Sequence, residues 1–113
     1  MEIPCPMRIA TETMGGRWKP GILWRLMDGP LRYGELRRGM PWISEKILIR
    51  HLRDLEAAGL ILRTDHGTQP PQVDYRLTAA GETLGPVLTA MAEWGSGWSA
   101  GSGDVESDVG LRA

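Results

Sequence analysis

A segment near the middle of the chain combines an apolar stripe with a cationic stripe. On a helical wheel, two leucines of the apolar stripe fall within about 40° of the third, Leu48; they are Leu52 and Leu55. The cations fall within about 40° of the opposite pole; they are Lys46, Arg50 and Arg53. Glu45 and Ile49 lie on one flank of the cationic stripe. A single exposed arginine is typical of an ordinary solvated surface, but three cations on one helix face favour an anionic partner.

The charge distribution along the chain supports this interpretation. The chain has 113 residues and a formal net charge of -1. Residues 8–63 hold 11 Lys or Arg and six acids, whereas residues 64–113 hold two Arg and seven acids. This segregation indicates a basic surface on one part of a single small domain.

The cationic segment has a clear beginning and end as a helix. Ser44 is a good N-cap, and Glu45 suits the positive end of the helix dipole. Gly59 fits the left-handed position after the last turn, which would bring Leu60 onto Leu55. These signals predict a helix over residues 44–58.

Four shorter elements are expected before this helix. Residues 6–14 and a segment starting near Pro20 favour helices, the second with an inward stripe made of Ile22, Leu23, Leu26 and Met27. Residues 31–33 favour an extended piece, and residues 35–38 a third short helix carrying Leu36 inward.

Two strands are expected after the cationic helix. Residues 60–65 and 72–77 favour strands, joined by a loop over residues 66–71. The order helix, turn, helix, hairpin predicts a mainly α fold with a small β-hairpin wing, which is a winged helix-turn-helix.

This fold class gives the cations a chemical role. The second helix of such a unit enters the major groove of DNA, where Arg meets guanine with two hydrogen bonds and an apolar side chain meets a thymine methyl. We therefore expect double-stranded DNA as the partner of the helix positions Ser44, Glu45, Lys46, Ile49, Arg50 and Arg53. Phosphate contacts are expected from Arg32, Arg37, Arg38, Arg63 and His66.

A last helix is expected after Thr78, and Pro86 should bend or restart it. Its Trp- and Met-rich stripe exceeds what one small core needs; the stripe is Val87, Met91, Trp94 and Trp98. A second copy of the chain would cover this stripe together with Met7, although the helix could instead fold back on its own domain. Residues 1–100 then form one domain, and the Gly/Ser-rich residues 101–113 a disordered tail.

Several classes of function lack the residues they need. One Cys and two separated His residues have no partners at metal-ligand spacing, so we expect no metal and no other cofactor. No arrangement of nucleophile and base is present, so no enzyme activity is expected. We also expect a cytoplasmic protein, because no apolar run or leader-like start is evident.

The order of short motifs resembles the HxlR-type winged helix-turn-helix transcriptional regulators over about residues 5–98. These motifs include Cys5-Pro6, residues 15–19, residues 29–38, the stretch from Ile43 to Leu60, and residues 71–81. The resemblance implies a bacterial, homodimeric DNA-binding repressor or activator that dimerises through its terminal helices and reads DNA with the helix beginning at Ser44. We expect this dimer to bind an inverted repeat. Ile49 departs from a position that is often polar in the family, and the loop around Gly67 has few cations, which predicts a weak wing contact.

Cys5 has two interpretations. The dipole of the first helix and the neighbouring Arg8 would favour its thiolate, the reactive form. Some HxlR-type regulators sense oxidants or electrophiles through a Cys just before this Pro, whereas a lone Cys is also common as a small buried hydrophobe. The seam between terminal helices could alternatively hold a small-molecule signal.

Another class of function stays open at this point. Winged-helix folds also serve as protein-interaction modules without DNA binding, and the Trp/Met stripe would suit one. The cationic face of the central helix argues for DNA.

Overall fold

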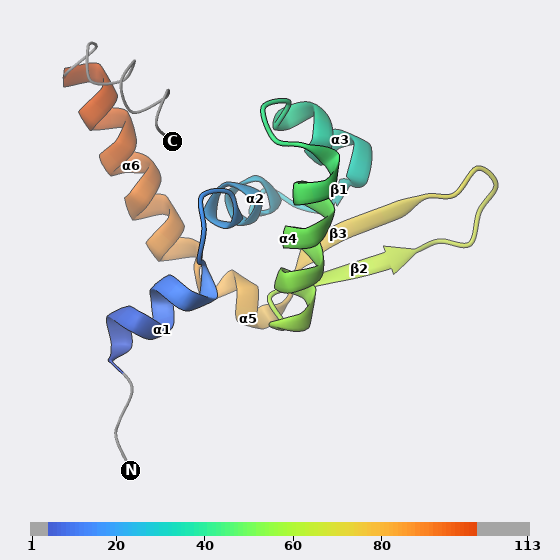
Figure 1. Ribbon diagram of the computed structural model, residues 1–113, viewed down its shortest axis with the longest axis horizontal. Helices are drawn as coiled ribbons and strands as arrows, with labels where there is room; N and C mark the ends of the chain where they lie inside the picture. Colours follow the sequence, from blue (N-terminus) through green and yellow to red (C-terminus); the bar gives the residue numbers. More distant parts are fainter. Residues whose placement is uncertain (1–4, 102–113) are drawn as a thin grey trace.

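The helix that carries the cations, α4 (Glu45–Ala57), lies at the centre of the computed structural model, which describes residues 5–101 (Figure 1). The Ser44 hydroxyl oxygen accepts a hydrogen bond from the Ile47 amide at 3.2 Å, as expected for its N-cap. At the other end, the Leu60 amide donates to the Leu55 carbonyl at 3.0 Å, with Gly59 at φ 78°. The predicted stop signal is therefore confirmed, because only this left-handed step lets the chain turn back onto the helix.

The remaining elements of the described range follow the predicted order. They are α1 (Pro6–Thr13), α2 (Lys19–Leu26), β1 (Leu31–Arg32), α3 (Tyr33–Gly39), β2 (Ile61–Asp65), β3 (Val73–Leu77), α5 (Ala79–Glu82) and α6 (Gly85–Gly101). The helices α3 and α4 form the helix-turn-helix, and β2 and β3 form the wing (Figure 1).

The strands make an antiparallel sheet in the order β1-β3-β2. Strands β2 and β3 pair from Ile61 opposite Leu77 to Asp65 opposite Val73. Strand β1 pairs Leu31 with Tyr75, a pairing that the sequence did not predict. This third strand fixes the base of the wing next to the start of α3.

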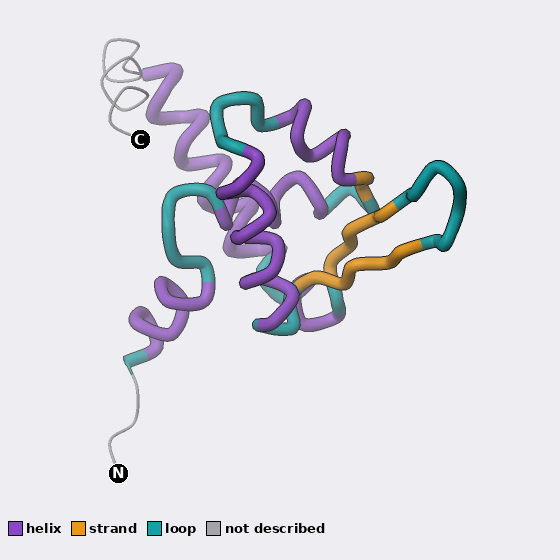
Figure 2. The backbone as a smooth tube through the Cα atoms, turned by 45° about the vertical axis from the view of Figure 1, so that its right-hand side comes forward, coloured by secondary structure: helices purple, strands orange, loops and turns teal. Residues whose placement is uncertain are grey.

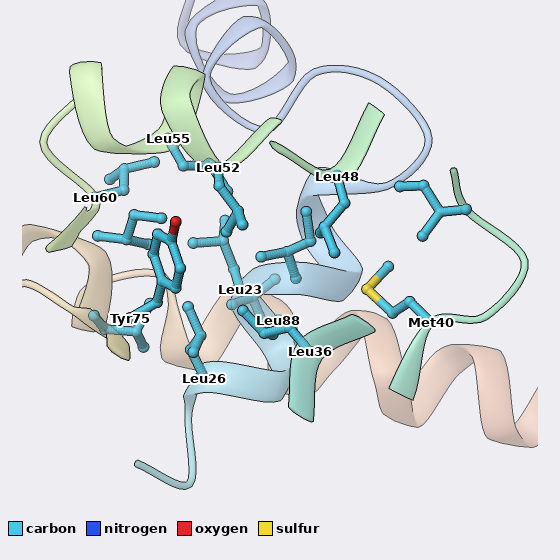
Figure 3. Packing of buried hydrophobic residues seen from close by; sticks show 14 residues of the cluster. Leu23, Leu26, Leu36, Met40, Leu48, Leu52, Leu55, Leu60, Tyr75 and Leu88 are labelled. Atoms are coloured by element: carbon cyan, nitrogen blue, oxygen red, sulfur yellow. The ribbon is translucent and has the colours of Figure 1, made fainter. Parts of the chain in front are cut away.

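The core lies between α2, α3, α4 and the sheet (Figure 3). All three leucines of the α4 stripe are buried, together with Ile22, Leu23 and Leu26 from α2. Each such side chain contributes about 1.5–3 kcal/mol of hydrophobic stabilisation. Burial of the leucine stripe leaves the opposite side of α4 facing outward.

Two element boundaries differ from the expectation. Tyr33 was expected to be extended, but it begins α3, because the Glu35 carboxylate accepts from the Arg32 amide at 2.8 Å and caps the helix two residues early. After β3 the chain forms the short α5, capped by Thr78, and restarts as α6 with Pro86 in its first turn, in agreement with the predicted restart. Helix α6 includes Gly101, and the rest of the expected tail lies outside the described residues.

The wing and the terminal helices lie at opposite sides of the molecule (Figures 1 and 2). The hairpin extends away from one side of α4, whereas α1 and α6 occupy the other side. No helix within residues 5–101 combines the length and apolarity required to cross a membrane.

Candidate nucleic-acid interface

The three cations of α4 are exposed to solvent, as the wheel predicted. Lys46, Arg50 and Arg53 form no ion pair with any residue in the described range. Asp54, the acid next to Arg53, is instead engaged by Lys19 of α2, with 3.5 Å between Nζ and Oδ2. The Lys19 pair therefore ties α4 to α2 and leaves the outward cations available.

A concave hollow of about 1060 Å³ lies between α3, α4 and the wing. Four of the predicted cations line it, each from a different element: Arg32 of β1, Arg38 of α3, Arg53 of α4 and Arg63 of β2. Three carboxylates also line it: Glu35, Glu45 and Glu56. The fold thus gathers charges that are far apart in the sequence around one concavity.

One flank of α4 faces this hollow. The α4 residues in its lining recur at spacings of four, four and three, which is one helix face: Glu45, Ile49, Arg53 and Glu56. Lys46 and Arg50 are exposed on the adjoining face, outside the lining. The wheel identified the outward half of the helix, but only the position of the wing selects which part of it faces the hollow.

Two predicted phosphate contacts have partners within the protein. Arg37 is half-buried, and its Nη1 donates to the Met40 carbonyl at 3.3 Å. His66 Nε2 lies 2.7 Å from Asp74 Oδ2, so this pair connects the ends of β2 and β3. Neither side chain is as free as the arginines that line the hollow.

Tyr33 belongs to the hollow but was not recognised in the sequence. Its hydroxyl is buried and has no hydrogen-bond partner among the residues that the structure describes. Burial, and then the nearby Glu45 carboxylate, raise the pKa of Tyr33 above its usual value of 10.0. Its position next to Arg32 could have indicated that Tyr33 belongs to the site. Tyr33 was instead expected in an extended segment, so it was not assigned to the site.

The residues expected at a dimer interface are exposed in the single chain. Helix α1 contains no buried residue, and Met7 is 70% exposed. On α6, Leu88 packs into the core, whereas the expected stripe is exposed: it comprises Val87, Met91, Trp94 and Trp98. The indoles of Trp94 and Trp98 stack with 5.3 Å between ring centroids.

Cys5 is an exposed free thiol directly before α1. Its exposure does not fit the interpretation as a buried hydrophobe. Arg8, which was expected to act on Cys5, instead pairs with Glu12 at 2.9 Å. Within the described part of the chain, no group of His, Cys, Asp or Glu residues is placed to hold a metal ion.

The helix-turn-helix, the wing and the cation-lined hollow together define a winged helix-turn-helix protein. A model of the HxlR-like helix-turn-helix family matches residues 13–102. The chain therefore belongs to the HxlR-like helix-turn-helix family, as its motifs indicated.

Relatives and solved structures agree with this assignment. The chain is 44% identical over 91 residues to the HTH-type transcriptional regulator YkvN of Bacillus subtilis, which covers 80% of this chain and 77% of the relative. It is similar to the redox regulator HypR in its oxidized form, with 39% identity, a TM-score of 0.79, and 82% and 96% of the two chains covered. It is also similar to the reduced form of the transcriptional regulator YodB from B. subtilis, with 36% identity, a TM-score of 0.71, and 81% and 91% covered. The chain is thus an HTH-type transcriptional regulator, which points away from an enzyme.

Proposed function

We propose that the protein is a homodimer that binds an inverted-repeat operator in double-stranded DNA. The observation that carries this proposal is the outward cationic face of α4 beside the hollow. With the leucine stripe buried, α4 is free to enter a major groove, which admits one helix. Because bacterial DNA lies in the cytoplasm, this activity also assigns the protein to that compartment.

The lining of the hollow suggests how the contacts divide. Arg53 and Ile49 both line the hollow, where Arg53 would donate two hydrogen bonds to a guanine and Ile49 would contact a thymine methyl. Arg32, Arg38 and Arg63 surround them from β1, α3 and the wing, where they would neutralise phosphates and fix the orientation of the duplex. Arg37 and His66 would contribute less, because both already have partners.

The terminal helices supply the surface for a second copy. Large apolar side chains on α1 and α6 are exposed on the side of the molecule opposite the wing. A twofold dimer through this surface would present two α4 helices, and an operator with two inverted half-sites matches that symmetry.

Salt dependence of operator binding tests the electrostatic part of the proposal. If each subunit makes three phosphate contacts, affinity should fall by about a thousandfold between 50 and 200 mM salt, because bound cations are released from DNA. A gel-shift series on a fragment selected from genomic DNA measures this. A flat response, or failure to retain any fragment, would favour the interaction module without DNA binding.

Substitution of single cations tests the assignment of α4. We expect Arg50→Ala and Arg53→Ala each to weaken operator binding by about 1–3 kcal/mol with the fold intact, because both side chains are exposed. Arg76→Ala is the matched control, since Arg76 is exposed on β3 outside the lining of the hollow. If the Arg53 and Arg76 variants bind the operator with equal affinity, Arg53 does not contribute to DNA binding.

We further propose that Cys5 makes the regulator responsive to oxidants or electrophiles. The thiol is exposed at the start of α1, next to the proposed dimer surface, and the similar protein HypR is a redox regulator. Oxidation there would bridge subunits or add bulk at the seam, and so change the spacing of the two α4 helices.

A comparison of wild type with Cys5→Ser tests this regulation. Peroxide or diamide should change the operator affinity of the wild type and leave that of Cys5→Ser unchanged, because only the former carries a thiol. Equal responses of the two proteins would contradict the proposal that Cys5 senses oxidants or electrophiles.

A further inference from the structure

An unpaired carboxylate lies where the proposed function brings DNA phosphates close. Glu45 is exposed in the first turn of α4 and lines the hollow together with Arg53. It forms no ion pair within residues 5–101. The helix dipole favours an acid in this turn by about 0.3–1 kcal/mol. The dipole gives no reason for the acid to occupy the flank that faces the hollow, where phosphate repulsion would oppose binding.

A carboxylate in a major groove has one favourable kind of contact. An ionised carboxylate only accepts hydrogen bonds, so it needs a donor on the edge of a base. Cytosine presents its N4 amino group, whereas guanine and thymine present acceptor oxygens. Adenine places the N7 acceptor beside its N6 amino group, so a carboxylate would be repelled as well as bound.

We propose that Glu45 selects a cytosine in each half-site, and that Tyr33 positions the Glu45 carboxylate for this contact. The proposal rests on the proposed DNA-binding function and assigns a base preference to one position of it. Glu45 precedes Ile49 and Arg53 by one and two turns on the same face, so the three side chains would meet successive parts of one groove.

Tyr33 provides the second observation. It is the first residue of α3 and lines the hollow, and its buried hydroxyl lacks a hydrogen-bond partner among the described residues. A buried hydroxyl without a partner is unfavourable, and a nearby carboxylate is a strong acceptor. A tyrosine hydroxyl is protonated at neutral pH and therefore able to donate, and burial and Glu45 raise the pKa of Tyr33 further. Donation to one Glu45 oxygen leaves the other oxygen free for the base.

Selection from a randomised duplex library tests the proposal. Wild type, Glu45→Gln, Glu45→Ala and Tyr33→Phe are compared at one salt concentration, with circular dichroism melting to verify folding. The wild type should prefer cytosine at one position in each half-site. Both Glu45 variants should lose this preference by about tenfold or more, because a good base contact discriminates by this much. Tyr33→Phe should reduce the preference at the same position by a smaller factor and leave the other positions unchanged.

Glu56→Gln is the matched control, since Glu56 is the other α4 carboxylate in the hollow. It should keep the cytosine preference. An unchanged motif in the Glu45 variants, an adenine in place of the cytosine in the wild-type motif, or an equal loss in Glu56→Gln would overturn the base assignment. A change at other positions in Tyr33→Phe would overturn its positioning role. If the wild type selects no motif, the proposed function itself fails, and this inference fails with it.

Discussion

At the scale of single residues, His51 of α4 lies where this helix meets the loop before α2. Its Nδ1 is buried without a hydrogen-bond partner in the described part of the chain, and its ring lies near Gly16. Burial lowers the pKa of His51 below its usual value of 6.5, and Lys19 adds to this, while Asp54 opposes it and Arg50 adds a further lowering. The folded protein therefore favours the neutral imidazole at this contact between α4 and the loop before α2.

This shift predicts a pH dependence of stability. A depressed pKa means that the unfolded chain binds the proton more readily, so the contribution of neutral His51 is complete above about pH 6.5 and is lost as pH falls further. Urea unfolding at pH 7.5 and 5.5 should show a larger loss of stability for wild type than for His51→Gln, which has no imidazole to protonate. An identical loss in the two proteins would show that His51 does not contribute.

At the scale of elements, α5 joins the sheet to the terminal helix through one close contact. A Cβ atom on Gly81 would overlap the carbonyl oxygen of Leu60 and come within 3.2 Å of Leu77 Cδ2. The Thr78 amide also donates to the Leu60 carbonyl, at 3.0 Å. The absence of a side chain at Gly81 thus lets α5 rest against the start of β2.

Alanine at this position should separate α5 from the sheet. We expect Gly81→Ala to lower the free energy of unfolding by about 1–3 kcal/mol, because the overlapping atom belongs to the backbone and cannot rotate away. Urea unfolding measures the loss. Gly97→Ala is the control, since nothing lies within 4 Å of its Cβ position, and it should stabilise α6 by about 0.5–1 kcal/mol. Similar effects at the two glycines would contradict the role of this contact.

At the scale of the whole molecule, the proposed DNA surface and the proposed dimer surface lie on opposite sides of the core (Figure 1). Helix α2 connects them, because it packs against both α6 and β3. In the proposed dimer, α2 therefore forms the packed connection between the terminal helices and the sheet. This arrangement suits a regulator whose signal acts on the distance between two reading helices.

The oligomeric state tests the terminal-helix surface. Trp94 is 67% exposed, so Trp94→Glu should keep the fold but place a charge in the apolar surface of the proposed dimer and convert that dimer to a monomer. Analytical ultracentrifugation measures the change, and operator affinity should fall with it. Trp42→Glu is the control, since Trp42 is 60% exposed in the turn before α4, and it should remain a dimer. If the Trp94→Glu protein remains a dimer, the dimer interface does not include Trp94.

The order of elements and the buried stripe of α4 could be read from the sequence, because caps, turns and hydrophobic periodicity are local signals. Ser44, Gly59 and the three leucines behave as their types and spacing predict. The outward direction of Lys46, Arg50 and Arg53 follows from the same periodicity.

Only the tertiary structure decided which outward residues share the hollow. The pairing of β1 with β3 and the position of the wing bring Arg32, Tyr33 and Arg63 beside α4, although Arg32 and Tyr33 precede this helix in the chain and Arg63 follows it. The pairing of β2 with β3 also brings His66 next to Asp74, whereas Arg37 is engaged locally by the Met40 carbonyl. The helical repeat determines which side chains of α4 point away from the core. Which of these side chains face the hollow depends on long-range contacts with β1 and the wing, which no local sequence pattern encodes.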